Sequence, residues 1–447
     1  MGDWRGYAGY AERDITPPKG IYSRNWGAAN FDVAEGVHRP LMLQCLAMGK
    51  EREDLRILIT ADLGWWKDNN DEWALRNQLL EHFHLREDQL LFCLSHTHAG
   101  PSICSRDAHL PGGELIQPYL EFLTRTATDC MEQALSDRSE CVLSWSTGVC
   151  SLATNRDLEV DGNYLVGYNP GATADQTLLV GQLKSVDGKL KGVLCNYACH
   201  PTSFAHLNKL ISPDYIGAAR EVIQQQLQAP MIFLQGASGD LAPKKQYTRD
   251  AAVVDNNGRM LGYAVLSALA GADKPGTKWV FEKMLSSGAP LALWTEIQTK
   301  PSVDLQGSIC KLPVSLKKLP DVAEIEKDYN ACEDRVLRER LWRKLNTRKW
   351  IGDRKAAEIS LWVWKIGEAF IVAQPNEAYS LYQTTVRQHF PDRNIIFINI
   401  ANGYVGYLPP AGYYDRDMYA VWQTPYAQGT LELLIEKTIN EIQSFLP

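Results

Sequence analysis

The sequence predicts an α/β protein with a large mixed central β-sheet flanked by helices. Short apolar runs with the length of a strand recur along the chain, and longer amphipathic stretches alternate with them. Histidines, a glutamate and tyrosines stand where several of these runs end. Alternating strands and helices build layered folds in which the loops that leave the strand ends carry the chemistry.

Ten apolar runs predict the strands of this fold. In chain order they span residues 41–48, 55–63, 90–95, 141–149, 178–184, 192–198, 231–235, 359–364, 369–373 and 394–400. Six amphipathic stretches predict helices at residues 71–82, 117–135, 215–227, 257–270, 322–349 and 377–389. The stretch at 322–349 is strongly charged, so it forms either a solvated face or an arm over a cleft.

The composition is that of an ordinary globular protein with a sizeable core. The 447 residues are 45% hydrophobic and 22% charged, and no repeat, low-complexity linker or charge block divides them. We therefore expect one domain over residues 1–447. The net charge of −7 is spread evenly along the chain, which argues against nucleic acid as a partner.

The chain shows no targeting or membrane-spanning pattern. Its first residues lack the apolar stretch of a signal peptide, and no later run reaches the length of a membrane span. Most of the ten cysteines stand inside apolar runs, where cysteine packs as a small hydrophobic side chain. We expect a cytoplasmic protein with reduced thiols and no stable membrane insertion. Cys199 is a candidate nucleophile, but no separate base is evident for it.

The most informative stretch is residues 89–102, with the sequence QLLFCLSHTHAGPS. In an extended chain, side chains two positions apart point to the same face, so His96 and His98 can address one cavity. Neutral imidazole is the commonest metal ligand. The pair therefore predicts a metal site, and a hydrogen-bonded histidine of the core is the structural alternative.

A third histidine ends the apolar run in residues 192–204, GVLCNYACHPTSF. Pro201 keeps His200 extended, so its imidazole is held at a strand end, where loops build sites. A lone His-Pro is more often structural than functional. Together with the first motif, His200 becomes the expected third donor of a catalytic zinc site, which keeps one position open for water.

Two more segments at strand ends contain polar residues. In residues 370–379, FIVAQPNEAY, a buried strand leads to Glu377 near the start of a predicted helix. A carboxylate there can also simply stabilise the helix N-terminus. Residues 400–419, IANGYVGYLPPAGYYDRDMY, form a tyrosine-rich loop after a strand, and such clusters usually pack or bind apolar ligands.

Eight short motifs follow one another along the chain. They are Asp14-Ile15-Thr16-Pro17, Ala61-Asp62-Leu63-Gly64, His96-Thr97-His98-Ala99-Gly100-Pro101, Asn155-Arg156, Cys199-His200-Pro201-Thr202, Gly239-Asp240, Pro375 to Glu377, and Tyr404-Val405-Gly406-Tyr407. In this order the chain resembles the catalytic domain of the neutral, non-lysosomal ceramidase family over nearly its full length. Most of the motifs are weak signals alone, but eight in register are a strong one.

The resemblance implies one zinc ion, Zn²⁺, held by His96, His200, Glu377 and Tyr407. Two imidazoles, a carboxylate and a weakly held phenol leave zinc Lewis-acidic, able to lower the pKa of a water and to polarise an amide carbonyl. The family's second tyrosine lies twelve residues beyond the ligand. Because Tyr419 stands at that spacing from Tyr407, the resemblance implies Tyr407 rather than Tyr404 as the ligand.

The resemblance also implies that His98, Arg156 and Tyr419 line the reaction centre. His98 would orient or shuttle a proton, and Tyr419 would donate a hydrogen bond to the developing oxyanion. Arg156 would clamp an acidic or hydroxylated part of the substrate.

The chain departs from the family in two respects. The motif in residues 233–244 ends in Ser-Pro in the family, whereas this chain has Ala242-Pro243, so a serine nucleophile is ruled out at that position. Family members that act on ceramide also carry a C-terminal sandwich domain, and this chain ends at Pro447 without one. Both departures argue against ceramide itself as the substrate. The missing serine is one that the resemblance implies contacts the substrate near the bond that is cleaved, and a sphingolipid is held in a membrane.

We therefore expect a zinc-dependent hydrolase that cleaves an amide bond in a small N-acyl compound by metal-activated water. A zinc esterase or lactonase acting on a small polar substrate is one alternative, because the same water serves both reactions. A non-catalytic homologue that only binds its ligand is the other. The sequence does not indicate an oligomeric state.

Overall fold

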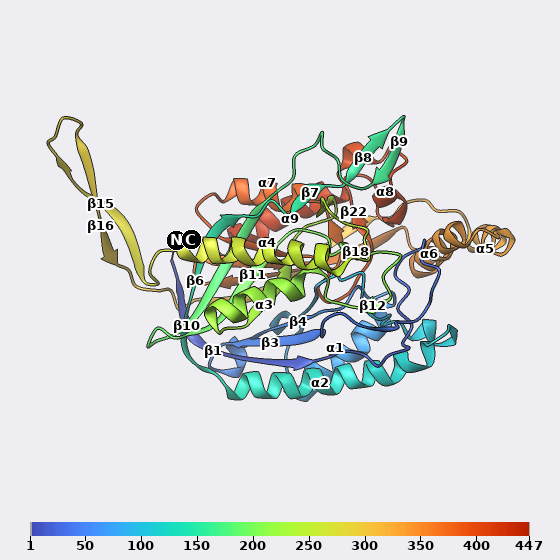
Figure 1. Ribbon diagram of the computed structural model, residues 1–447, viewed down its shortest axis with the longest axis horizontal. Coiled ribbons are helices and arrows are strands. Elements are labelled where there is room, and N and C mark those ends of the chain that lie inside the picture. Colours follow the sequence, from blue (N-terminus) through green and yellow to red (C-terminus); the bar gives the residue numbers. More distant parts are fainter. Residues whose placement is uncertain (1, 447) are drawn as a thin grey trace.

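The computed structural model describes residues 2–446, and these fold into four stacked layers (Figure 1). Helices cover the outer face of an eight-stranded sheet, and a four-stranded sheet packs against the inner face. Two further helices cover the other side of the four-stranded sheet. The expected α/β fold with a large mixed central sheet flanked by helices is confirmed.

The eight-stranded sheet has the order β13-β11-β10-β6-β1-β3-β4-β5. Its strands are, in chain order, β1 (Trp4–Asp14), β3 (Met42–Met48), β4 (Arg56–Ala61), β5 (Leu90–Leu94), β6 (Ser139–Val149), β10 (Thr177–Ser185), β11 (Leu190–Tyr197) and β13 (Met231–Gln235). The outermost pairs, β4 with β5 and β11 with β13, run parallel, and the other neighbours are antiparallel. The sheet is therefore mixed.

The four-stranded sheet has the order β17-β18-β19-β21 and also ends in a parallel pair, β19 with β21. Its strands are β17 (Leu305–Ser315), β18 (Ala356–Ile366), β19 (Ala369–Ala373) and β21 (Ile395–Ile398). Five short pairs complete the strands: β2 (Gly36–Val37) with β12 (Leu210–Ile211), β7 (Ala153–Asn155) with β14 (Leu241–Pro243), β8 (Asp157–Val160) with β9 (Asn163–Val166), β15 (Thr277–Leu285) with β16 (Leu291–Gln298), and β20 (Glu377–Ala378) with β22 (Tyr407–Leu408).

The helices divide among the layers by their apolar faces. The outer face of the large sheet is covered by α1 (Asn69–Phe83), α2 (Ile116–Ser136), α3 (Tyr215–Leu227) and α4 (Ala251–Ala270). The small sheet is covered by α7 (Leu381–His389) and α9 (Thr430–Ser444). The remaining helices are α5 (Val322–Ala331), α6 (Arg335–Ile351) and α8 (Tyr419–Gln423).

Alternation along the strands explains this layering. In β3, Leu43, Cys45 and Ala47 belong to the core beneath α1 and α2, whereas Leu46 and Met48 belong to the core between the two sheets. Successive side chains of a strand point to opposite faces, so both faces of a buried strand are apolar. The near-continuous apolar runs of the sequence follow from this burial on both sides.

A short segment after β21 joins the two edges of the large sheet close to the strand ends. The amide of Asn399 donates to the carbonyl of Gln235 at the end of β13, at 2.9 Å. One residue later, the carbonyl of Ile400 accepts from the amide of Leu94 at the end of β5, at 3.1 Å. The loops that follow these distant strands are thereby brought together.

All ten predicted strands lie within three residues of observed ones, and three of the six predicted helices lie within two. The helix expected at 257–270 begins six residues earlier, at Ala251, and two other helix predictions need larger corrections. The helix expected at 322–349 is interrupted, because Asp334 caps a new helix by accepting from the amide of Leu337 at 2.7 Å. The helix expected from Glu377 begins only at Leu381, and Glu377 lies in β20. Glu377 is therefore not a helix-capping residue.

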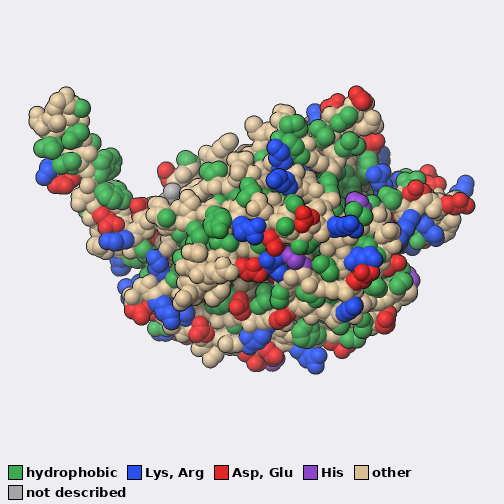
Figure 2. Space-filling model, in the orientation of Figure 1, with side chains coloured by type: hydrophobic (Ala, Val, Ile, Leu, Met, Phe, Trp, Pro, Cys, Tyr) green, Lys and Arg blue, Asp and Glu red, His purple; other side chains and the backbone are tan. Residues whose placement is uncertain are grey.

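The strands β1, β15, β16 and β17 and the helix α9 have no predicted counterpart. The ribbon of β15 and β16 projects from one end of the long axis of the molecule, opposite α5 and α6 (Figure 1). Trp279, Phe281 and Trp294 of this ribbon are more than half exposed. Figure 2 shows hydrophobic side chains along the ribbon.

None of the helices in residues 2–446 combines the length and the apolar character that crossing a bilayer requires. The ten cysteines all carry free thiols, and eight of them are buried. Burial raises the pKa of the Cys199 thiol well above its ordinary value, so this side chain stays protonated. The interpretation of Cys199 as a core residue is favoured over that of a nucleophile.

Candidate metal centre

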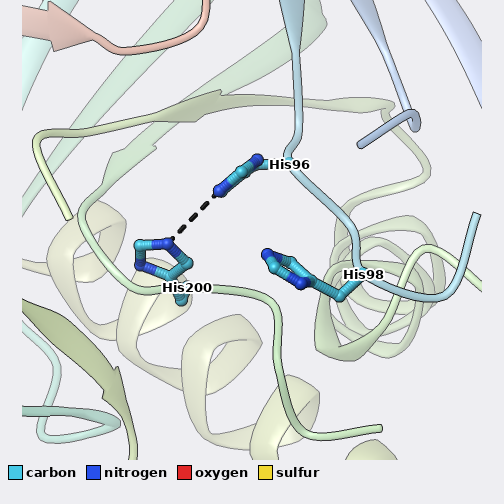
Figure 3. Close-up of side chains that lie close together, drawn as sticks. All are labelled: His96, His98 and His200. Atoms are coloured by element: carbon cyan, nitrogen blue, oxygen red, sulfur yellow. Dashed lines mark hydrogen bonds between the residues drawn. The ribbon is translucent and has the colours of Figure 1, made fainter. Parts of the chain in front are cut away.

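Three histidines from two distant loops converge at the ends of β5 and β11 (Figure 3). His96 and His98 follow β5, and His200 follows β11. One ring nitrogen of each lies within 4.8 Å of one ring nitrogen of both others. His96 has a φ of 68°, a left-handed backbone that is costly for a residue with a Cβ and is found mainly where function requires it.

Three electron-donating atoms form a small triangle at this point. The Nε2 atoms of His96 and His200 are 3.2 Å apart, and the carboxylate Oε2 of Glu377 lies 3.1 Å from the first and 2.8 Å from the second. All three side chains are buried.

The outer nitrogens of both rings are held by backbone carbonyls. His96 Nδ1 lies 3.1 Å from the carbonyl of Gly64, and His200 Nδ1 lies 2.6 Å from the carbonyl of Ser238 and 3.1 Å from that of Leu241. A carbonyl only accepts, so Nδ1 of each ring carries the proton. Each Nε2 then presents a lone pair, which is the arrangement that metal-binding histidines adopt.

The electrostatics of the buried site keep these donors in their ligating forms. Burial and the nearby guanidinium of Arg156 lower the pKa of His200 to about 3. Burial opposes ionisation of Glu377, yet the neighbouring imidazoles of His96 and His200 hold its pKa well below the ordinary value. Near pH 7, His200 is therefore neutral and Glu377 is ionised.

The strand pair β20 and β22 places Glu377 beside Tyr407. The two residues are direct partners in a parallel register, so they neighbour each other on this short ladder. The hydroxyl of Tyr407 lies 3.5 Å from His200 Nε2, and the hydroxyl of Tyr404 donates to the second carboxylate oxygen of Glu377 at 2.7 Å. Tyr407 thus adjoins the donor triangle, while Tyr404 orients Glu377.

Arg156 reaches the site from the end of β7. Its Nη2 donates to the hydroxyl oxygen of Tyr407 at 2.8 Å and to the carbonyl of Gly239 at 2.9 Å, and its Nε also donates to Gly239. A cation beside the phenol favours electron density on the phenol oxygen. Nη1 has no hydrogen-bond partner among residues 2–446.

His98 lies next to the triangle, between two indole rings. Its ring centroid is 5.2 Å from that of Trp26 and 4.9 Å from that of Trp65. Both of its ring nitrogens are buried, and neither has a hydrogen-bond partner within the described residues. Burial and the other two histidines lower its pKa well below the ordinary value. A neutral imidazole without partners at this position is available to a ligand, a substrate or a water.

Tyr419 begins α8, and its ring meets the ring of Tyr407 edge-on at 5.6 Å between centroids. Its hydroxyl makes no hydrogen bond within residues 2–446. The seven residues expected at the site from the sequence, namely His96, His98, Arg156, His200, Glu377, Tyr407 and Tyr419, therefore lie in one neighbourhood.

The donor set fits a zinc ion. Two imidazole lone pairs and a carboxylate oxygen face one another with no hydrogen between them, an arrangement that a cation stabilises. Donors at tetrahedral positions about 2.0–2.2 Å from zinc lie roughly 3.3–3.6 Å apart, close to the spacings of this triangle. His98 is a second candidate for the third ligand, since one of its nitrogens lies within 4.8 Å of a nitrogen of each other ring. Glu377 Oε2 lies within 3.1 Å of both Nε2 atoms and is the better placed of the two.

Ala242 lies fully buried in β14, paired with Thr154 of β7. The same turn supplies the two carbonyls that orient His200. The segment therefore supports the site through its backbone even though it offers no serine side chain there.

A cavity of about 580 Å³ is separated from the triangle by Trp65 and Tyr404, and no residue of the triangle lines it. Its walls include α6, residues 65–70 up to the first turn of α1, and the turn around Ser105–His109. Trp65 contacts His98, and Tyr404 contacts Glu377. The charged helix at 335–351 thus covers a cleft, which was one of its two expected roles.

Sequence reasoning did not single out Trp26, Trp65 or Arg343, which border this neighbourhood. Trp65 follows directly on the Ala61-Asp62-Leu63-Gly64 motif, and this adjacency is the only signal that pointed to it. Trp26 and Arg343 stand in segments without any distinctive pattern.

No protein-family model and no curated protein matches the sequence. Among solved structures, a ceramidase complexed with C2 aligns over 99% of this chain and 76% of its own, with a TM-score of 0.69 at 14% identity. The neutral ceramidase from Pseudomonas aeruginosa aligns over 100% of this chain and 75% of its own, with a TM-score of 0.67 at 15% identity. The chain therefore has a neutral ceramidase-like fold.

Proposed function

We propose that this protein is a zinc-dependent hydrolase that cleaves an amide bond in an N-acyl compound with water. The observation that carries the proposal is the buried triangle of His96 Nε2, His200 Nε2 and Glu377 Oε2, in which three lone pairs meet at one point. Similarity to structures of ceramidases, which share the fold, supports an amide as the bond that is cleaved.

In this proposal His96, His200 and Glu377 hold the zinc, with Tyr407 as the fourth donor. Bound zinc supplies Lewis acidity toward a water and toward the carbonyl oxygen of the substrate. Gly64, Ser238 and Leu241 fix the imidazoles through their carbonyls, and Tyr404 fixes the carboxylate.

The remaining polar groups act on the substrate. His98 takes the proton of the attacking water and returns it to the leaving amine, because both of its nitrogens are free of protein partners. Tyr419 donates its hydroxyl to the oxyanion that develops on the carbonyl. Arg156 holds Tyr407 through Nη2 and keeps Nη1 for an acidic or hydroxylated part of the substrate.

A hydrolysis screen tests the proposal. Purified protein is incubated with N-acyl amines, N-acyl amino acids and their matched esters and lactones, and released acid, amine and alcohol are quantified by mass spectrometry. We expect turnover of amides that 1,10-phenanthroline abolishes and added zinc restores. Preference for the esters would instead assign the esterase or lactonase alternative. Absence of any metal-dependent turnover would overturn the proposal.

A further inference from the structure

We propose that the cavity beside the metal centre recognises an anionic group of the substrate, a carboxylate or phosphate remote from the bond that is cleaved. This inference rests on the proposed function for the identity of the reaction, but it concerns the cavity walls and not the metal ligands. Three independent features of the lining point to an anion: its charge, its unpaired hydrogen-bond donors and the arrangement of α6.

The lining has more positive than negative side chains. Seven of its residues are lysine or arginine, and three are aspartate or glutamate. Six of the seven cations have carboxylate partners: Glu339 is shared by Arg24 and Arg343, Lys67 pairs with Asp107, Arg106 with Asp68, and Arg335 and Lys349 pair with Asp32 and Glu326 outside the lining. Arg338 has no carboxylate partner among residues 2–446. Figure 2 shows basic and acidic side chains interspersed over α5 and α6 at this end of the molecule.

The unpaired polar atoms of the cavity are all donors. Among the lining residues, the buried nitrogens without a hydrogen-bond partner are Arg24 Nε, Trp66 Nε1 and Asn346 Nδ2. No lining residue has a buried oxygen in that condition. These N–H groups lie beneath the cavity wall and do not reach its space. Their partial positive charges are not neutralised by protein acceptors, so they favour an electron-rich ligand on the other side of the wall.

One face of α6 presents these groups together. Arg335, Arg338, Trp342, Asn346 and Lys349 recur at intervals of three or four residues, which places them on one side of the helix, and all five line the cavity. The guanidinium of Arg338 lies 4.7 Å from the ring centroid of Tyr329, so stacking holds its plane while its N–H groups stay free. Such a guanidinium binds carboxylate and phosphate through paired hydrogen bonds.

The cavity adjoins the reaction centre, and Trp65 and Tyr404 stand between them. The guanidinium of Arg343 lies 5.8 Å from the ring centroid of Trp65, and that ring lies 4.9 Å from the ring of His98. Its volume of about 580 Å³ suits a small molecule. Aromatic side chains between the arginines and the metal centre would pack on the apolar part of the same molecule.

Two pairs of probes test the inference. N-hexanoyl-phenylalanine is compared with N-hexanoyl-phenylalaninamide, and N-hexanoyl-O-phosphotyramine with N-hexanoyl-tyramine. Affinities are measured by calorimetry on the full chain in chelator, so that no turnover intervenes, and kcat/KM is measured on the zinc-loaded protein. We expect at least one anion to bind about 10-fold or more tightly than its neutral partner, with a preference that weakens as salt is raised.

Variants identify the groups responsible. Arg338→Gln and Arg343→Gln should each reduce the preference several-fold, whereas Lys344→Gln, on the same helix but outside the cavity, should leave it unchanged. A difference in affinity within the phenylalanine pair indicates a carboxylate site, and a difference within the tyramine pair indicates a phosphate site. Equal affinity within both pairs, or binding of no probe, overturns the inference. Anion preference without turnover would leave the inference standing and remove the proposed function, and turnover without preference would do the reverse.

Discussion

At the scale of single residues, the site depends on side chains that neighbouring groups hold in one conformation. His96 occupies a left-handed backbone conformation, and its outer nitrogen is fixed by the carbonyl of Gly64. Glu377 is fixed by Tyr404 and faces both imidazoles with its other oxygen. Preorganised donors of this kind bind a metal without paying for rearrangement.

Removing a proposed ligand should remove the metal and the activity together. We expect His96→Ala and Glu377→Gln to lower zinc affinity by about 100-fold or more and to reduce kcat/KM by several orders of magnitude. Zinc content by mass spectrometry and turnover of the best amide substrate are the measurements. His82→Ala, an exposed histidine on α1, is the matched control and should change neither.

Substitution of His98 separates the two candidate donor sets. If Glu377 is the third ligand, His98→Ala should keep its zinc and lose about 10²- to 10⁴-fold in kcat, the usual contribution of a proton-transferring residue. Loss of zinc by this variant would instead make His98 a ligand and contradict the role proposed for it.

At the scale of helices and strands, most elements were predictable from the sequence, because apolar runs and amphipathic stretches reflect burial. The strands β3, β5, β11 and β13 were found for this reason, since each is buried on both faces. The strands β15 and β16 were not predicted, because they pack on little of the core and so lack a continuous apolar run. The break between α5 and α6 depends on one helix cap at Asp334. A single capping residue does not change the helical periodicity of the long charged stretch, so the sequence predicted one continuous helix.

The packing of α3 on α4 illustrates how a close approach limits the sequence. A Cβ added at Gly258 would lie 2.2 Å from the carbonyl oxygen of Tyr215 and 2.6 Å from the Cβ of Ala218. We expect Gly258→Ala to lower the melting temperature by several degrees, corresponding to about 1–3 kcal/mol of overpacking. Gly271→Ala, where the added Cβ meets only one atom at 3.8 Å, should change it little. Equal melting temperatures would mean that the two helices can separate without cost.

At the scale of the whole molecule, the sequence linked Glu377 and Tyr407 to the histidines only through the resemblance to a family. The pattern of strand ends alone linked His96 and His98, two positions apart, with His200. It could not link them to Glu377, because their meeting depends on the segment at 399–402 that joins β13 to β5. The cavity charge was equally hidden, since its lysines and arginines come from four separate stretches of the chain.

The projecting ribbon should be dispensable for the fold. The amide of Thr299 donates to the carbonyl of Gly276 at 2.7 Å, so a two-residue linker can replace residues 277–298. We expect the shortened protein to melt within a few degrees of the full chain, because a lone two-stranded ribbon contributes little stability. Differential scanning calorimetry checks this, and a large drop would show that the ribbon packs against the body in solution.

The junction at Asn399 and Ile400 has a consequence for biosynthesis. The proposed ligands lie between positions 96 and 407, and the segment at 399–400 that joins their strands is synthesised after both histidines. A nascent chain that still lacks residues 399–407 therefore exposes His96 and His200 without a complete set of ligands. Zinc should be acquired only after this segment has been made, and chains truncated before residue 399 should compete poorly for the ion.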